Sequence, residues 1–139
     1  MRRQYAIRSA APPDAEAMLA LWRVAGAEVT LTDDLAGVEA LLSHDPEAVL
    51  LAVAGDEVTG SLIAAWDGWR GQLYRLAVAP AWRRHGVATA LVGAGEQRLR
   101  SMGARRIAAI AVAGHDHAVG FWRAVGYEQM DQVRLVRSV

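Results

Sequence analysis

The chain has 139 residues, and its 15 basic and 15 acidic side chains cancel, so it carries no formal net charge when the histidines are neutral. This length suits one domain, residues 1–139, with a hydrophobic core of its own. Balanced charge gives no indication of a nucleic acid or an anionic membrane as partner. The absence of cysteine excludes a disulfide scaffold, a thiolate metal site and a cysteine nucleophile. No signal-peptide pattern and no long apolar stretch occur, so we expect a soluble, cytoplasmic protein.

The N-terminal part predicts a strand over residues 4–8 and then a helix. Pro12 and Asp14 mark the start of the helix, because proline suits the first turn and a carboxylate there is stabilised by the helix dipole. Gly26 marks its end. The side chains expected to face the core are spaced as on one face of a helix: Met18, Leu21, Trp22 and Ala25.

A second helix is predicted to begin after Thr32, which is a good N-cap residue. Asp33 and Asp34 follow in the first turn, where capping and the helix dipole give carboxylates a plain structural role. Pro46 lies just beyond the expected end of this helix.

Five more strands are predicted by apolar runs or by alternation, over residues 48–54, 58–66, 73–78, 107–113 and 132–136. The uninterrupted apolar run of residues 107–113 is typical of a central strand that is buried on both faces. Gly60 indicates a bulge in its strand. Trp22 and Trp122 lie on helical stripes and are expected in the core, whereas Trp66 and Trp69 flank a turn and are expected to be partly exposed.

A basic loop leads into a helix that is predicted to begin after Gly86 and to end at Gly103. Free N–H groups at a helix N-terminus and the helix dipole both favour an anion, and glycine lets a ligand approach the backbone. Arg83, Arg84 and His85 add positive charge to this loop. The loop therefore predicts a phosphate-binding site, although a basic surface turn before an ordinary helix would use the same residues.

Two loose motifs carry a resemblance to one known family. The loop matches [Q/R]-x-x-G-x-[G/A] through Arg83, Gly86 and Ala88, and neither a P-loop nor a dinucleotide-binding glycine motif occurs. Residues 118–127, AVGFWRAVGY, are similar to A-x-x-F-Y-x-x-x-G-[F/Y], and the strand over residues 107–113 lies between the two motifs. Over nearly the whole chain, this order resembles the GNAT superfamily of N-acetyltransferases.

The resemblance implies an α/β (α+β) GNAT fold with the element order β-α-α-β-β-β-α-β-α-β. A mixed central sheet of six to seven strands and about four helices is then expected. The reaction implied is attack of a free amine on the thioester of acetyl-CoA. The family's cofactor contacts carry over to Leu76, Ala77, Val78, Arg83, Arg84, His85, Gly86, Val87, Ala88, Thr89, His115, Phe121 and Trp122.

The groups that transfer protons depart from the family pattern. The tyrosine that protonates the departing thiolate in the family is replaced by Trp122, and an indole N–H is not an acid at useful pH. Tyr74 is one replacement candidate, because it shares a strand face with Leu76 and Val78, and its hydroxyl is therefore expected to point toward the cleft; simple packing against the sheet is its other role. His115, before the last helix, is the second candidate. The resemblance also makes the backbone N–H of Val78 the oxyanion donor.

Two classes of function stay open: an active N-acetyltransferase for a small amine or a protein amino group, and a catalytically weak acyl-CoA-binding module, which Trp122 would favour. In the family, Asp33 and Asp34 would border the acceptor and could attract a cationic amine. The H-x-H at residues 115–117 has no third ligand, so no metal is expected. A homodimer is left open, and the turn at residues 67–71 looks like that of small bacterial proteins of the YpeA-like branch.

Overall fold

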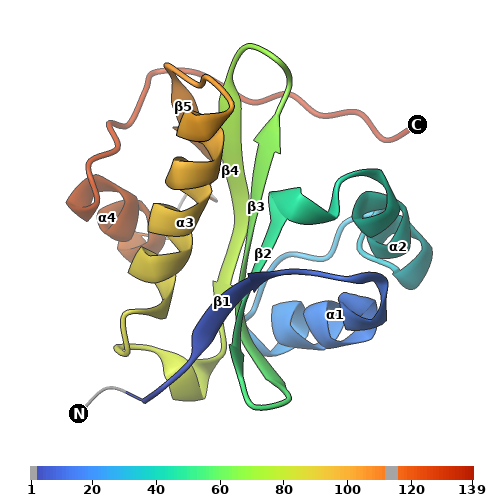
Figure 1. Cartoon of the computed structure of the whole chain (residues 1–139). Coiled ribbons are helices and arrows are strands. Elements are labelled where there is room, and N and C mark those ends of the chain that lie inside the picture. Colours follow the sequence, from blue (N-terminus) through green and yellow to red (C-terminus); the bar gives the residue numbers. More distant parts are fainter. Residues whose placement is uncertain (1–2, 112–115) are drawn as a thin grey trace.

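The computed structural model describes residues 3–111 and 116–139, which form a five-stranded sheet with helices on both faces (Figure 1). The strands are β1 (Ala6–Ser9), β2 (Val49–Ala54), β3 (Glu57–Trp66), β4 (Gly71–Val78) and β5 (Ile107–Ala109). The α-helices are α1 (Ala15–Val24), α2 (Leu35–His44), α3 (Val87–Ser101) and α4 (Asp116–Ala124). Short 3-10 turns lie at Pro12–Asp14, Pro46–Ala48 and Pro80–Trp82.

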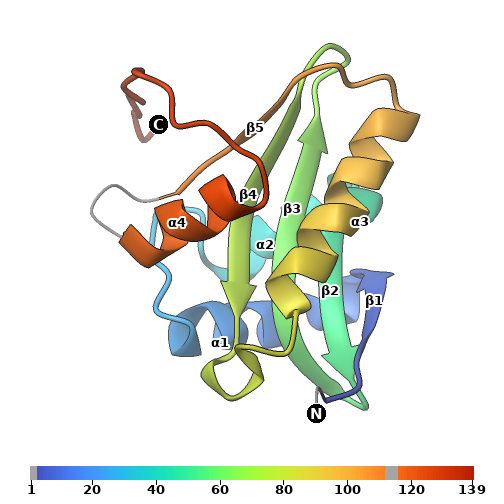
Figure 2. The ribbon, with the colours of Figure 1, turned by 90° about the vertical axis from the view of Figure 1, so that its left-hand side faces the viewer.

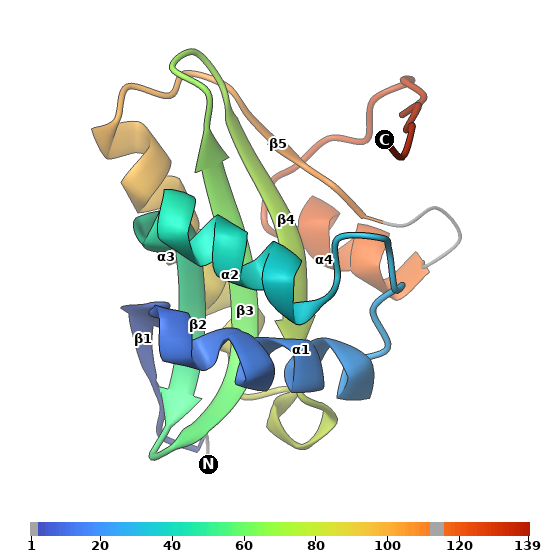
Figure 3. The same ribbon diagram turned by 90° about the vertical axis from the view of Figure 1, so that its right-hand side faces the viewer.

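The strands lie in the order β1-β2-β3-β4-β5, antiparallel from β1 to β4 and parallel between β4 and β5. Helices α3 and α4 cover one face (Figure 2), and α1 and α2 cover the other (Figure 3). The element order therefore agrees with the prediction as far as α4. In the described ranges, no helix combines the length and the apolar character that crossing a membrane requires.

The predicted count of six to seven strands is wrong, because the described sheet has five. Residues 132–136 are irregular, and Val133 and Leu135 are 85% and 88% exposed. β5 is three residues long and lies at the edge of the sheet rather than at its centre; residues 112–113 of the predicted strand lie outside the described ranges. An alternating or apolar pattern gives a strand only where a neighbouring strand completes its hydrogen bonds, and a local pattern cannot supply that neighbour.

Two helix starts differ from the prediction. The first helix opens as a 3-10 turn at Pro12–Asp14, and α1 proper begins at Ala15. The N-cap of α2 is Asp34 rather than Thr32, because the Asp34 carboxylate accepts from Gly37 N at 2.7 Å. Asp33 instead closes the preceding turn by accepting from Thr30 N at 2.7 Å, and this moves the helix start two residues along the chain.

The core lies on both sides of the sheet. Trp22 on α1 and Trp122 on α4 are buried as predicted, while Trp66 is half-buried and Trp69, at the β3–β4 turn, is 70% exposed. The register between β2 and β3 shifts beside Gly60, which confirms the predicted bulge. Small side chains in the strands let α3 lie close to the sheet.

The Gly60→Ala variant tests this close approach. A Cβ at Gly60 would lie 2.8 Å from Val87 Cγ1 and 3.2 Å from Ala77 O, so we expect a loss of about 1–3 kcal/mol of unfolding free energy. Gly93→Ala is the matched control, because a Cβ at this exposed position of α3 meets no atom within 4 Å. It should gain about 0.5–1 kcal/mol through helix propensity. Denaturant unfolding measures both, and an unchanged Gly60→Ala midpoint would contradict the close packing.

Candidate active site

The N-terminal end of α3 borders a cavity of about 240 Å³, which we call the α3 hollow. Residues of β4, the basic loop, α3 and α4 line it: Val78, Trp82, Arg83, Arg84, Gly86, Val87, Ala88, Thr89 and Phe121. All of these except Trp82 belong to the set that the motifs predicted as cofactor contacts. The tertiary structure therefore gathers both motifs around one cavity.

Two left-handed residues shape the loop before α3: Arg84 has a φ of 67° and Gly86 a φ of 80°. The N–H of Ala90 donates to Gly86 O at 3.0 Å and so begins the helical ladder. The N–H groups of Val87, Ala88 and Thr89 come before that ladder and have no carbonyl within the helix to bond. With the exposed Arg83 and Arg84 beside them, these amides make a site for an anion at the end of the α3 dipole.

Four described residues of the predicted set do not line the α3 hollow: Leu76, Ala77, His85 and Trp122. His85 turns toward the N-terminal segment, where its Nδ1 accepts from Arg3 N at 3.0 Å. Trp122 is 6% exposed and packs edge-to-face against Phe121 and Tyr127, within the core.

β4 and β5 pair over only part of their length. The parallel ladder joins Gly71–Leu73 to Ile107–Ala109, and Ile110 N still donates to Leu73 O at 3.1 Å. β4 continues to Val78, and its later residues pair with β3. In residues 3–111 and 116–139, no strand pairs with the other edge of β4 beyond Leu73. The backbone of Leu76, Ala77 and Val78 thus lies at a strand edge that leads to the α3 hollow.

A second bulge interrupts β4, and the sequence did not predict it. Ser61 pairs with Ala77 but Ile63 pairs with Tyr74, so β4 contains one extra residue between them. Arg75 lies at this point with a φ of 55°, a left-handed conformation that costs a non-glycine residue about 1–2 kcal/mol. The bulge changes which side chains of β4 lie on which face of the sheet, because a register shift of one residue moves each later side chain to the other face.

The bulge overturns the predicted position of Tyr74. Gly60 pairs with Val78 and faces α3, whereas Ile63, three positions further along β3, pairs with Tyr74 and faces the other side. Tyr74 therefore does not share a face with Val78. Its side chain is half-buried, and burial raises the pKa of its hydroxyl above the usual range for tyrosine.

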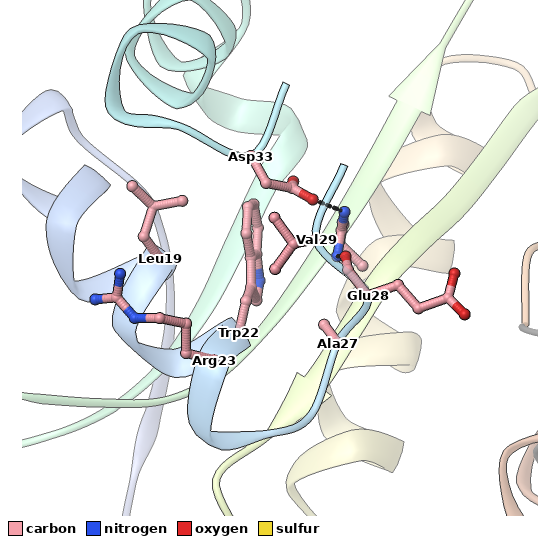
Figure 4. Close-up of a pocket in the computed structure, with 8 residues that line it drawn as sticks. Leu19, Trp22, Arg23, Ala27, Glu28, Val29 and Asp33 are labelled. Carbon is pink, nitrogen blue, oxygen red and sulfur yellow. Dashed lines mark hydrogen bonds and ion pairs between the residues drawn. The ribbon is translucent and has the colours of Figure 1, made fainter. Parts of the chain in front are cut away.

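A smaller cavity of about 120 Å³, the α1 hollow, lies on the face covered by α1 and α2 (Figure 4). Its lining comes from α1, the segment after α1 and the bulge of β4: Leu19, Trp22, Arg23, Ala27, Glu28, Val29, Asp33 and Arg75. Figure 4 shows the guanidinium of Arg23 and the carboxylate of Glu28 directed away from Trp22 on opposite sides. Asp33 forms an ion pair with Arg75, so the charges that remain within this hollow are paired with each other.

Arg75 and Trp22 connect the α1 hollow to the bulge. The guanidinium of Arg75 also donates to Glu28 O at 3.1 Å and lies 5.0 Å from the centre of the Trp22 ring. Trp22 Nε1 donates to the buried Ser61 Oγ at 2.9 Å, and Ser61 Oγ donates to Arg75 O at 2.9 Å. The backbone and the side chain of Arg75 are thus both held by groups on the α1 side.

His115 lies outside the described residues, and so does part of the predicted H-x-H site. In the part of the chain that the structure describes, no three acidic or histidine side chains come together as a metal site would require.

Comparison with known proteins decides the family. Residues 9–127 match the model of the acetyltransferase (GNAT) family. The chain belongs to this family. An acetyltransferase of Pectobacterium atrosepticum is 32% identical over 122 residues, which cover 88% of this chain and 86% of the relative. The GNAT chain is therefore an N-acetyltransferase, and the resemblance that the two motifs indicated is confirmed.

Solved structures share the fold of this GNAT chain. The PaiA N-acetyltransferase of Thermoplasma acidophilum, solved with coenzyme A, has a TM-score of 0.81 at 14% identity, covering 94% of each chain. The aminoglycoside N-acetyltransferase AAC(6')-Iy, in complex with CoA, has a TM-score of 0.75 at 19% identity, covering 99% of this chain and 98% of that one. At these identities the likeness shows the fold, and the acceptor has to be inferred from this chain's own residues.

Sequence reasoning missed three residues of this GNAT site: Ser61, Arg75 and Trp82. Ser61 left a detectable signal, because a hydroxyl among the mostly apolar residues of this strand needs a buried partner. Arg75 left none, because an arginine in a strand is ordinary and only the register shift reveals its conformation. Trp82 stands beside the predicted loop, and its burial against the loop appears only in the folded chain.

Proposed function

We propose that residues 1–139 act as one domain that transfers the acetyl group of acetyl-CoA to a primary amine by direct attack. The observation that carries this proposal is the α3 hollow, which brings the first helix amides of α3, Arg83 and Arg84 next to an edge of β4 that no strand in the described ranges pairs with. Diphosphate is an anion that such amides and guanidinium groups bind well. The adjoining β4 edge would then pair with the extended pantetheine arm.

In the proposed reaction, the amine nitrogen attacks the thioester carbonyl carbon, a C–N bond forms and the C–S bond breaks. The carbonyl oxygen gains negative charge on the way, and the backbone N–H of Val78 is the proposed donor to it. The ammonium must lose one proton before its nitrogen can attack, and the nitrogen loses a second proton as the amide forms; the departing thiolate takes up one of the two, and the other goes to solvent. A thiol has an ordinary pKa of about 8.5, so the thiolate leaves without strong acid assistance.

Tyr74 and His115 are the proposed proton-transfer groups. Burial raises the pKa of Tyr74, so its hydroxyl keeps its proton at neutral pH and can donate but does not act as a base. Its register places it on the face of the α1 hollow, the side from which we propose that the amine arrives. For His115, the support is its place in the sequence before the last helix.

The α1 hollow is the proposed acceptor site, and its charge and size favour a compact amine. Asp33 is already paired with Arg75, and Glu28 directs its carboxylate away from Trp22 (Figure 4), so little unpaired negative charge remains for a polycation. The walls formed by Leu19, Trp22 and Val29 instead suit a small apolar group. A monoamine with such a group fits better than an aminoglycoside. The notion that Asp33 attracts a cationic amine loses support, since its charge is neutralised.

A panel of amines tests the proposal, with release of the CoA thiol as the signal. Compact apolar monoamines should be acetylated with a higher kcat/KM than polycationic aminoglycosides. Acetyl-CoA should also raise the melting temperature, because a ligand that binds only the native state adds about 2.7 kcal/mol at 100 times its Kd. A melting temperature that does not respond to saturating acetyl-CoA would contradict the whole proposal.

A second function, that of a weakly catalytic acyl-CoA-binding module, is favoured by one observation: Trp122 occupies the motif position of the usual tyrosine and is buried. The same measurements separate the two functions. Thermal stabilisation by acetyl-CoA without thiol release for any amine would support the binding module.

A further inference from the structure

One side chain, Arg75, contacts both parts of the proposed site. Its backbone forms the bulge of β4, directly before the edge amides of Leu76, Ala77 and Val78. Its guanidinium extends away from these amides and contacts Asp33 and Glu28 O, which belong to the segment that lines the α1 hollow. This arrangement is more than a surface ion pair, because the side chains of Arg75 and Asp33 are only 19% and 11% exposed.

The contacts form a closed ring around the bulge. From Trp22 on α1, hydrogen bonds run through Ser61 Oγ to the carbonyl of Arg75, and the Arg75 guanidinium returns over the Trp22 ring. The ring holds a left-handed arginine in a strand, a conformation that non-glycine residues rarely keep without support. If the ring opens, the bulge can shift by one residue, and those backbone N–H groups between Leu76 and Val78 that point to the edge of β4 would then point toward β3.

On this basis we propose that Arg75 is a positioning residue, whose guanidinium ties the segment of residues 27–33 to the bulge of β4. The same contact sets the walls of the acceptor site and the direction of the amides that would hold the acetyl group. Arg75 need not touch the reacting atoms to do this. The proposal rests on the acetyl transfer proposed above, and it adds that the acceptor side and the acetyl-CoA side are coupled through this residue.

Three variants separate the parts of the proposal. Arg75→Ala removes the guanidinium and keeps the backbone strain, whereas Arg75→Gly removes the guanidinium but accepts a positive φ without strain. Asp33→Asn keeps the size and most hydrogen bonds of Asp33 but removes the charge that pairs with Arg75. Arg8→Ala is the matched control, because Arg8 forms an exposed two-bond pair with Asp14 away from both hollows.

We expect Arg75→Ala to lower kcat by up to about 10²-fold, since small misplacements of a reacting group have effects of this size. Arg75→Gly should recover part of kcat but retain a raised acceptor KM, and Asp33→Asn should raise the acceptor KM as well. The thermal shift produced by acetyl-CoA should persist in all three, although reduced in Arg75→Ala, because the α3 hollow keeps its proposed diphosphate contacts while the β4 edge shifts. The double variant Arg75→Ala/Asp33→Asn should lose less than the product of the single losses. Arg8→Ala should match the wild type in every measurement.

Three results would overturn the proposal. The first is an Arg75→Ala variant whose kcat and acceptor KM are the same as those of the wild type. The second is full recovery of both constants in Arg75→Gly, which would show that the backbone conformation suffices without the guanidinium. The third is a double variant whose loss of kcat/KM equals the product of the losses in the two single variants. Failure of the wild type to acetylate any amine would instead contradict the proposed function, so the two failures are distinguishable.

Discussion

The Gly86→Asp variant is expected to lose the thermal stabilisation that acetyl-CoA gives to the wild type. Gly86 is the N-cap of α3, and its φ of 80° presents the backbone of the loop to the α3 hollow. An aspartate here adds a side chain and a negative charge where the diphosphate is proposed to bind. Both effects oppose the ligand, so a stabilisation of about 2.7 kcal/mol at 100 times Kd should fall to nearly zero.

Gly86→Asn is the control that separates charge from shape. Asparagine has the size of aspartate, and both residues tolerate left-handed backbone better than most, so each should lower the stability of the free protein by a similar amount, about 1–2 kcal/mol or less. We expect Gly86→Asn to keep a weakened response to acetyl-CoA and Gly86→Asp to show none. Thermal melts of both variants with increasing acetyl-CoA make the comparison. Normal binding by Gly86→Asp would place the phosphate site elsewhere on the chain.

The second large effect concerns Trp122. Its ring centre lies 5.5 Å from that of Phe121 and 5.0 Å from that of Tyr127, in edge-to-face contacts, and it is almost completely buried. Trp122→Tyr removes ring volume from this cluster and should cost about 1–3 kcal/mol of unfolding free energy; Trp122→Ala should cost about 3–5 kcal/mol. Neither variant should raise kcat, because the side chain faces the core rather than the α3 hollow.

Trp69→Tyr provides the matched control, since it makes the same substitution at a 70% exposed position. It should change the stability by no more than about 0.5 kcal/mol. Denaturant unfolding and steady-state kinetics on all variants test the prediction. A several-fold higher kcat for Trp122→Tyr would show that a hydroxyl at this position reaches the sulfur after all, and that Trp122 merely replaces the family's acid.

Residues that are neighbours in the chain made much of the proposed acetyl-CoA site predictable. The loop before α3 could be recognised because glycine, basic residues and a helix start stand next to one another in the chain. The burial of Trp22 and Trp122 could also be predicted, because helical spacing assigns a residue to one face of a helix. In contrast, the interpretation of Thr32 as an N-cap failed, because Asp34 offers a competing cap two residues later and only the folded turn shows which one is used.

The sequence by itself determined the family, the order of the elements up to α4 and the glycine and basic residues at the start of α3. These features depend on residues that are neighbours in the chain, where spacing and side-chain type act directly. Only the tertiary structure decided the number of strands in the described sheet, the edge position of β5, the face of Tyr74 and the contacts of Arg75. Each of these depends on the register between strands or on contacts across it, as in the ring that links Trp22, Ser61 and Arg75. A register shift of one residue leaves no trace in composition or periodicity, yet it reverses which side chains meet.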